Sequence, residues 1–466
     1  MLKPSLANSI LYETPEQLSQ FLQHEQDLDV IDEYGYTPLI EAAIVDSTEK
    51  AELILKAGAS IDFPDLTGRT ALHWSTDNNN LELTQLLLKH GANPNAYSSA
   101  GQPVLVMPFL RKQTRLVTLL KEKGASLNFA QDFINAKLLA HRFLLRGRVD
   151  IVNPKDELIE IDYEGFYIES SLAFLLHSLQ DFINNFQART LREYFPEIKE
   201  AIASLNNAAE LIKYQHYKIN TNEHERQIYS LLDKDLLVIP VAYEGHAISL
   251  IKYGDLLVRC DRGEYGKAHG TVIISRMGPN KVMSKRFLTE LMYRPLSREF
   301  VTQEFDKLLN LKTIMTLPLS PQTSGNCSWA NIEAALLASV FLLFVKNSPQ
   351  TSLENFKQAQ KKAFLIYDEW QQWDRDRSLD FCIDNFHEAN DLHKLSKAAM
   401  LTSIFIQQCR YEDLKDFDRA KRILPIITQP KYCYILKAYL DVFNQTQNKE
   451  LLNKIENYLD DFGVNL

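Results

Sequence analysis

The stretch Asp32-Glu-Tyr-Gly-Tyr-Thr-Pro-Leu39 is repeated 33 residues later as Asp65-Leu-Thr-Gly-Arg-Thr-Ala-Leu72. Two sets of glycines keep the same spacing: Gly35, Gly68 and Gly101, and Gly58, Gly91 and Gly124. A fixed period of this length indicates repeated units of structure that stack on their neighbours. About a quarter of the chain is therefore expected to be a solenoid.

The chemistry of each unit fits a hairpin followed by two helices. The first glycine of a unit turns the hairpin, Thr37 or Thr70 caps the first helix, and the second glycine ends the second helix in a left-handed conformation. These units resemble the ankyrin repeat. The third unit departs from the pattern, because Pro103 replaces the threonine and Pro108 falls inside the first helix.

The solenoid needs ends that cover its core. Residues 15–31 predict a helical N-terminal cap, and residues 132–145 predict the start of a closing helical unit. Leucines and an isoleucine near the ends of the second helices are expected to face the stacking core: Ile54, Leu55, Leu86, Leu87, Leu119 and Leu120.

The resemblance to ankyrin repeats implies protein binding through the concave face and the hairpin tips. The tip residues expected to bind are Glu33, Tyr34, Tyr36, Leu66, Thr67 and Arg69. Two tyrosines at one tip favour contact with a partner, because tyrosine is enriched at protein interfaces. A purely structural spacer is the alternative.

Beyond the repeats, the hydrophobic periodicity changes several times. Residues 149–168 alternate as in a β-ribbon, and helical spacing returns at 168–186 and 190–214. Five short runs then predict an antiparallel sheet: Leu236–Tyr243, His246–Tyr253, Leu256–Asp261, Gly270–Arg276 and Leu311–Pro318. The apolar run Ala334–Val345 is too short to span a bilayer and predicts a buried helix, and Leu353–Phe462 has helical spacing.

These patterns predict an α+β multidomain protein. The expected domains are an ankyrin-repeat solenoid with capping helices (1–146), a β-ribbon and helical segment (147–230), an antiparallel-sheet domain (231–350) and an all-helical C-terminal bundle (351–466). The last residues, 453–466, are interpreted as a solvated helix end, with a bacterial export signal as the alternative.

Composition narrows the function. A net charge of −9 argues against direct binding of nucleic acid or an anionic membrane. The five cysteines form no C-x-x-C pair and are odd in number, which disfavours a disulfide framework or zinc site and fits a reducing compartment, and no signal peptide is recognised. Walker, G-x-G-x-x-G and H-E-x-x-H motifs are missing from the sequence, so no cofactor is expected.

The segment Pro321-Gln-Thr-Ser-Gly-Asn-Cys-Ser-Trp-Ala-Asn-Ile332 carries the candidate chemistry. The turn residues Ser324, Gly325 and Asn326 place Cys327 in the first turn of the buried helix, where unpaired N–H groups and the positive end of the helix dipole favour a thiolate. A small buried cysteine is the alternative. Trp329 and Asn331 are expected to pack against and cap the helix start.

A base and its orienting carboxylate are predicted on one hairpin. With a two-residue turn at Tyr253-Gly254, His246 and Asp261 lie directly opposite each other, close enough for the carboxylate to hold the imidazole. A surface His/Asp pair is the alternative. Metal binding by His246, Cys260 and His269 is disfavoured, because hairpin alternation points Cys260 away from His246 and Asp261.

Gln322 completes the set, since a side-chain amide just before the nucleophile can donate to a developing oxyanion together with the Cys327 N–H. The order His246, Asp261, Gln322, Cys327 resembles papain-like thiol hydrolases of the adenovirus-protease and ubiquitin-like-protein-protease group, which includes bacterial acetyltransferase effectors. The resemblance implies a papain-like cysteine-protease-like domain and these four residues as catalytic. Four residues separate Gln322 from Cys327 where five are usual, and Ala247 replaces a frequent tryptophan.

As a whole the chain resembles the ankyrin-repeat effectors of Legionella and related intracellular bacteria. This resemblance implies type IV secretion into a host cell, action in its cytoplasm or nucleus, and a host protein bound by the repeats. Acyl transfer, first of all peptide or isopeptide hydrolysis, is the expected activity. The alternative is a catalytically silent ankyrin scaffold that binds and redirects a host protein complex. The oligomeric state is not predicted.

Overall fold

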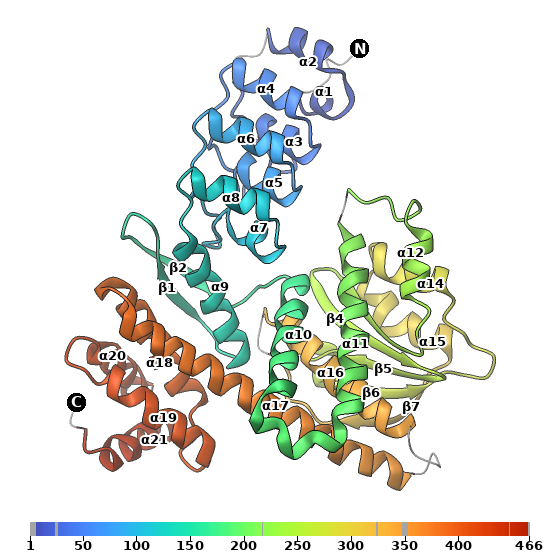
Figure 1. Ribbon diagram of the computed structural model, residues 1–466, viewed down its shortest axis with the longest axis vertical. Coiled ribbons are helices and arrows are strands. Elements are labelled where there is room, and N and C mark those ends of the chain that lie inside the picture. The colour runs from blue at the N-terminus through green and yellow to red at the C-terminus, as the bar shows by residue number, and fades with distance from the viewer. Residues whose placement is uncertain are drawn as a thin grey trace. The chain divides into compact units, whose positions relative to one another are not determined.

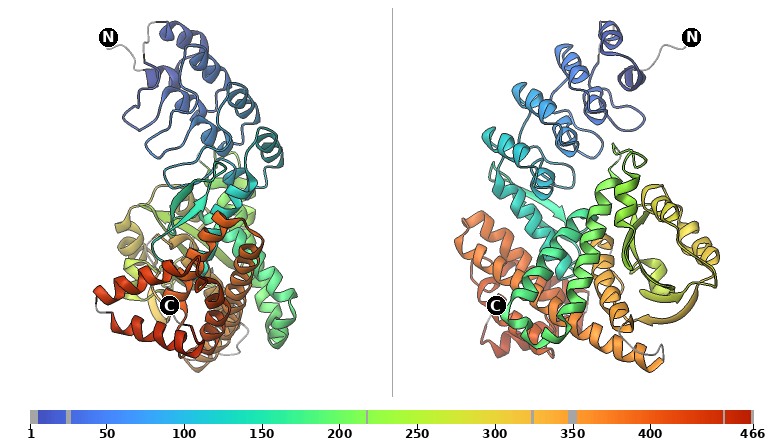
Figure 2. Two further views of the ribbon diagram at one scale, coloured as in Figure 1. Left: turned by 90° about the vertical axis from the view of Figure 1, so that its left-hand side faces the viewer. Right: turned by 45° about the vertical axis from the view of Figure 1, so that its right-hand side comes forward.

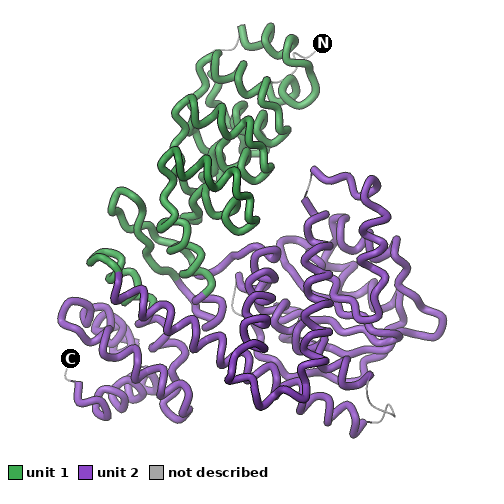
Figure 3. Tube along the Cα trace, in the orientation of Figure 1, with its two compact units in different colours: residues 1–138, 148–162, 389–400 green, residues 139–147, 163–388, 401–466 purple. Residues whose placement is uncertain are grey.

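The computed structural model describes residues 6–23, 27–216, 218–322, 325–346, 353–446 and 448–464. The chain forms two compact units, which are shown in different colours in Figure 3. Unit 1 comprises residues 1–138, 148–162 and 389–400, and unit 2 comprises residues 139–147, 163–388 and 401–466. The division into four domains that the sequence suggests remains a prediction.

The helices and strands follow one another in the order below, and most of them are labelled in Figure 1. The repeat region and β-ribbon contain α1 (Leu6–Tyr12), α2 (Pro15–Leu22), α3 (Pro38–Ile44), α4 (Thr48–Lys56), α5 (Ala71–Asp77), α6 (Leu81–Lys89), α7 (Val106–Leu110), α8 (Thr114–Glu122), α9 (Leu127–Arg142), β1 (Arg148–Val152) and β2 (Leu158–Asp162). Next come α10 (Ile168–Asn184), α11 (Phe195–Ile212), α12 (Glu225–Leu231), β3 (Leu236–Tyr243), β4 (His246–Tyr253), β5 (Leu256–Cys260), α13 (Glu264–His269), β6 (Val272–Arg276), α14 (Lys285–Tyr293), α15 (Phe305–Leu309) and β7 (Lys312–Leu317). The chain ends with α16 (Cys327–Lys346), α17 (Leu353–Glu388), α18 (Asp391–Gln408), α19 (Leu414–Ile427), α20 (Cys433–Gln445) and α21 (Lys449–Asp461).

The repeats of unit 1 form as their sequence predicts. At the first hairpin, Oδ1 of Asp32 accepts the N–H groups of Tyr34 and Tyr36, and the hydroxyl of Thr37 caps α3 by accepting the N–H of Ile40 at 3.3 Å. Successive hairpins are joined by backbone bonds, such as Leu66 N–H to the carbonyl of Gly35 at 3.2 Å. The structure therefore confirms the repeat period and its turn chemistry.

The predictions for the ends of the solenoid are partly wrong. The N-terminal cap is two short helices, α1 and α2, instead of one helix over residues 15–31, and residues 24–26 of that range lie outside the described residues. The closing helix α9 starts at Leu127, earlier than expected, because the chain enters it three residues after Gly124. In the third repeat the first helix, α7, has only five residues and no side-chain cap, in line with the loss of its threonine, while the second helix is kept as α8.

Unit 2 is built on a five-stranded antiparallel sheet in the order β3-β4-β5-β6-β7, close to the predicted strands. One face packs against α10, α11, α16 and α17 in a core that includes Val238, Ile251 and Val258. The other face packs against α12, α14 and α15 through Leu237, Ile239 and Leu250. The right-hand view of Figure 2 shows helices on both sides of the sheet.

Helix α16 lies in the centre of the larger core. Every residue from Ser328 to Val345 is buried, which confirms the prediction of a core helix around the run Ala334–Val345. Among the described residues α16 alone is long and apolar enough to cross a membrane, but protein covers all of its apolar stretch. Because a fully apolar helix must be surrounded by protein, its position fixes where its first residue lies.

One position differs between the first two repeats in a way that matters for stability. Trp74 donates its indole N–H to Oδ2 of Asp65 at 3.0 Å in the second repeat. The equivalent position 33 residues earlier is Glu41, which is buried beside Asp32. Burial first, and then the Asp32 carboxylate, raise the pKa of Glu41 to about 8. The folded chain therefore holds a proton where the second repeat has an indole N–H.

We expect Glu41→Gln to remove a pH dependence of folding, because an amide can donate to Asp32 at every pH. In the wild type the folded state keeps the Glu41 proton until pH about 8, whereas the unfolded state releases it near the ordinary value of 4.5. The folded state thus binds more protons in this window, so its stability falls as pH rises from about 4.5 to about 8.

Thermal unfolding midpoints of the full chain at pH about 5 to about 9 measure this effect. The midpoint of Glu41→Gln relative to wild type should rise with pH and then level off. Glu49→Gln, a change of an exposed glutamate on α4, serves as the control. A difference between Glu41→Gln and wild type that stays constant with pH would contradict the expectation.

Candidate active site

Cys327 begins α16 at the end of a tightly packed turn. The carbonyl of Asn326 accepts the N–H of Ala330 at 3.0 Å and so opens the helix, while the carbonyl of Gly325 accepts the N–H of Gly165 at 2.9 Å. Gly325 has φ +66°, and a Cβ atom there would lie 2.3 Å from Cβ of Glu164. Glycine is therefore required at this turn, which places the half-buried Cys327 side chain; the expected turn residue Ser324 lies outside the described residues.

The structure brings His246 and Asp261 together, but not in the expected register. The β4–β5 turn is Gly254-Asp255, so Tyr253 pairs with Leu256 and Ser249 with Cys260. This register differs by two residues from the one that puts His246 directly opposite Asp261. Because a shift of two residues keeps each side chain on its face, His246 Nε2 still meets Oδ1 of Asp261 diagonally, at 2.9 Å.

Asp261 is almost completely buried and receives several hydrogen bonds. Besides His246, the N–H of Gly263 donates to Oδ1 at 2.9 Å and the hydroxyl of Tyr243 donates to Oδ2 at 3.3 Å. Burial alone would raise the pKa of Asp261, but the hydrogen bond and charge of His246 together with the other donors lower it. The carboxylate is thus kept ionised where it can orient the imidazole.

His246 is also hydrogen-bonded to Cys327. Burial opposes the charged imidazole, yet the bonds to Asp261 and Cys327 raise the pKa of His246 to about 9. Burial likewise opposes the thiolate, but the bonds from His246 and from the backbone of Ala247 and Ser328 lower the pKa of Cys327. The arrangement therefore favours a thiolate–imidazolium pair.

Gln322 lies close to Asp261 along the fold. Its backbone N–H donates to the carbonyl of Arg262, the residue that follows Asp261, at 2.8 Å. Its side-chain Oε1 is 3.4 Å from Nδ2 of Asn331. His246, Asp261 and Cys327 thus interact directly in unit 2, and Gln322 is joined to them through Asn331 and the backbone of Ala247 and Arg262.

The expectation that Asn331 caps the start of α16 is wrong. Its Nδ2 donates to the carbonyl of Ala247 at 2.7 Å and its Oδ1 accepts the N–H of Arg262 at 2.8 Å, so it joins the helix to the residues beside His246 and Asp261. Trp329 is buried as expected, and its ring is stacked 6.4 Å from that of His141.

An ion pair that the sequence did not reveal fixes α16 further. The guanidinium of Arg262 bonds to Glu333 at 3.2 Å and to the carbonyl of Ser320 at 2.7 Å, and the side chains of Arg262 and Glu333 are 2% and 3% exposed. Asn331 and Glu333 are polar exceptions in an apolar buried helix. That contrast is the sequence signal by which they could have been found, because buried polar side chains need partners.

Gly263 packs directly on the imidazole. A Cβ atom at this position would lie 2.8 Å from both Cε1 and Nε2 of His246, closer than such atoms approach. The neighbouring Tyr243 ring also contacts the imidazole edge-on, with its centroid 5.3 Å from that of His246. The ring of His246 is therefore held from two directions.

The predicted tip residues of unit 1 differ in exposure. Tyr34 and Leu66 are 68% and 74% exposed, and Glu33 and Thr67 are also exposed. Tyr36 packs edge-on against Trp74 at 5.6 Å, and the Arg69 guanidinium lies 4.2 Å from the same ring while pairing with Asp77. Of the two tyrosines, only Tyr34 projects far from the repeat.

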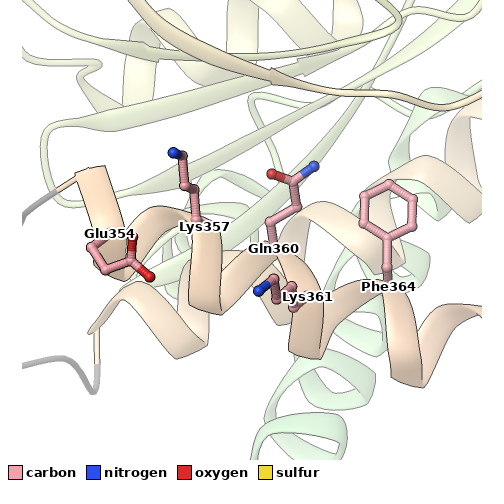
Figure 4. A pocket seen from close by; sticks show the side chains of 5 residues that line it. All are labelled: Glu354, Lys357, Gln360, Lys361 and Phe364. Atoms are coloured by element: carbon pink, nitrogen blue, oxygen red, sulfur yellow. The ribbon is translucent and has the colours of Figure 1, made fainter.

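A surface cavity of about 530 Å³ lies elsewhere in unit 2, along the first turns of α17 (Figure 4). It is lined by Glu354, Lys357, Gln360, Lys361 and Phe364, none of which belongs to the group around Cys327. Cys260, a candidate metal ligand, is fully buried in the core that contains α16. In the part of the chain that the structure describes, no three His, Cys, Asp or Glu side chains gather as a metal site.

Comparisons with known proteins support the repeats and the whole architecture. An ankyrin-repeat family with three copies matches residues 6–98. The solved structure of the Legionella effector AnkH is similar to this chain with a TM-score of 0.82 and 39% identity, covering 99% of this chain and 98% of that one. A search of curated proteins finds no match.

A second solved structure, the ankyrin repeat domain of Bcl-3, a member of the IκB family, has 32% identity. It covers 27% of this chain and 57% of its own, with a TM-score of 0.26. The resemblance of the sequence to Legionella ankyrin-repeat effectors, and to Ankyrin H among them, is confirmed by the match along nearly the whole chain. The chain belongs to the family of the Legionella ankyrin-repeat effector AnkH.

Proposed function

We propose that this protein is a bacterial effector that enters a host cell through type IV secretion, binds a host protein through its ankyrin repeats and carries out acyl transfer at Cys327. Hydrolysis of a peptide or isopeptide bond is the first choice of reaction. The observation that carries the enzymatic part is His246, which is bonded to the thiol of Cys327 and to the carboxylate of Asp261.

The reaction follows from the roles of these groups. The Cys327 thiolate attacks the carbonyl carbon and forms an S–C bond, while backbone N–H groups and the Gln322 amide hold the oxyanion. The C–N bond then breaks, and the amine leaves with the proton from His246. Water, deprotonated by His246, next attacks the thioester, which releases the acid and the thiol. Deamidation and acetyl transfer would use the same steps with other substrates.

A catalytically silent scaffold is the second candidate. Two departures from the related hydrolases favour it: the four-residue spacing between Gln322 and Cys327, and Ala247 in place of tryptophan. In a scaffold the exposed tips, such as Tyr34 and Leu66, would hold a host protein complex without changing it covalently.

We expect the alkylation of Cys327 by iodoacetamide to titrate below the ordinary thiol pKa of about 8.5, because His246 stabilises the thiolate. His246→Gln and Asp261→Asn should both raise the midpoint, the first by removing the cation and the second by removing the carboxylate that keeps it charged. Mass spectrometry of the Cys327 peptide measures the rate, with the half-buried Cys433 in the same digest as reference. A midpoint at the ordinary value in the wild type would exclude the thiolate mechanism.

We expect Gly263→Ala to raise the same midpoint, because the new methyl group would displace the His246 ring. Gly278→Ala is the matched control, since its added Cβ would meet the Asn310 side chain at 2.7 Å and neither glycine has a positive φ. Equal effects of the two changes would mean that Gly263 does not position the imidazole.

Capture of host proteins by the full chain separates recognition from chemistry. Tyr34→Ala with Leu66→Ala should lower recovery at least tenfold if the tips bind, because truncation of a tyrosine that anchors an interface costs about 2 kcal/mol or more. Leu158→Ala, a change of an exposed leucine of β2, is the control. Undiminished recovery would show that the tips are not the recognition surface.

The same capture with Cys327→Ala distinguishes the enzyme from the scaffold. An enzyme releases a shortened or otherwise modified partner only when Cys327 is present, so the mass of the captured protein should differ between wild type and Cys327→Ala. A scaffold predicts identical masses and amounts for the two proteins.

A further inference from the structure

Asn331 has its amide orientation fixed by two backbone groups of known polarity. The N–H of Arg262 can only donate, so the Asn331 atom that it meets at 2.8 Å is Oδ1. The carbonyl of Ala247 can only accept, so the atom that meets it at 2.7 Å is Nδ2. The side chain of Asn331 is 1% exposed, so water does not compete for these bonds.

The orientation of the Asn331 amide determines the orientation of the Gln322 side-chain amide. Nδ2 of Asn331 has a second hydrogen, which points at the Gln322 amide 3.4 Å away. A donor requires an acceptor, so Gln322 turns its Oε1 toward Asn331 and its Nε2 to the other side. Among the described residues, no group accepts a hydrogen bond from this Nε2. The backbone N–H of Gln322 is hydrogen-bonded to Arg262, and its side-chain amide is hydrogen-bonded to Asn331. The residue is therefore held at its backbone and at the end of its side chain.

We infer that Asn331 is a positioning residue, which sets the Gln322 amide so that Nε2 is presented as an oxyanion donor for acyl transfer at Cys327. This inference rests on the proposed function. Asn331 follows Cys327 by four residues, one helical turn, so the same helix carries the nucleophile and the group that orients its oxyanion donor. This link provides a donor despite the shortened spacing between Gln322 and Cys327.

Two probes of the thiol separate positioning of the donor from reactivity of the sulfur. In acetylation by p-nitrophenyl acetate, the thiolate attacks the ester carbonyl, an oxyanion forms, and p-nitrophenolate leaves as the thioester is made. In alkylation by iodoacetamide, the thiolate displaces iodide at a saturated carbon, and no oxyanion forms. The ratio of the two rates at Cys327, measured on its peptide by mass spectrometry, therefore reports the oxyanion donor.

We expect Asn331→Asp to lower this ratio by up to roughly 10²-fold, the size of effect known for loss of one oxyanion donor. The new carboxylate offers Gln322 only acceptors, so the amide turns its Nε2 inward. Gln322→Glu should lower the ratio equally while leaving the bonds of Asn331 to Arg262 and Ala247 in place. The double variant should lower it no further, because both changes remove the same donor.

Asn207→Asp is the matched control, since Asn207 is also buried in unit 2 and its Nδ2 donates to the carbonyl of Leu231 at 2.7 Å. Its ratio should equal that of the wild type. An unchanged ratio in Asn331→Asp would overturn the inference, and so would an unchanged ratio in Gln322→Glu, which remains informative if Asn331→Asp does not fold. Failure of the proposed function looks different: wild-type Cys327 would then be acetylated no faster than Cys433.

Discussion

The burial of α16 is the constraint on which the rest of unit 2 depends. The helix is mostly apolar and buried from Ser328 to Val345, so it is stable only when packed between α10, α11, α17 and the sheet. Two polar links fix its position along the sheet: Asn331 and the Arg262–Glu333 pair. Removal of one partner of such a buried pair costs about 3 to 5 kcal/mol, so the helix cannot slide without a large penalty. Because Cys327 is the first residue of α16, these contacts determine where it lies.

Most of the fold could be predicted because its signals are local. Hairpin and capping chemistry repeat every 33 residues, so the ankyrin units were recognisable from Asp32, Thr37 and their equivalents. The strands of unit 2 follow in sequence order, so alternation and turn residues nearly sufficed to place them. The ends of the solenoid were harder, since the two-helix cap and the early start of α9 depend on packing between segments.

The sequence predicted which residues form the candidate site, but not the contacts that hold them in place. The turn between β4 and β5 was misplaced by one residue, and the His246–Asp261 contact survived because that error shifts the register by two and keeps the face. Asn331 was assigned to the helix cap, because its position in the sequence gives no sign of Ala247 and Arg262, which lie far away along the chain. Likewise Gly263 and Tyr243 gained their roles only from the folded arrangement around the imidazole.

The order of segments along the chain also bears on when the thiol differs from an ordinary one. His246 begins β4 and Asp261 directly follows β5, so the two residues meet through contacts that are close in the sequence. Cys327 lies on α16, which is separated from both residues along the chain by β6 and β7. A chain in which α16 is not packed on the sheet therefore carries an ordinary cysteine, because the thiol meets His246 only through this packing. A polypeptide threaded through a narrow channel would thus pass in a chemically quiet form.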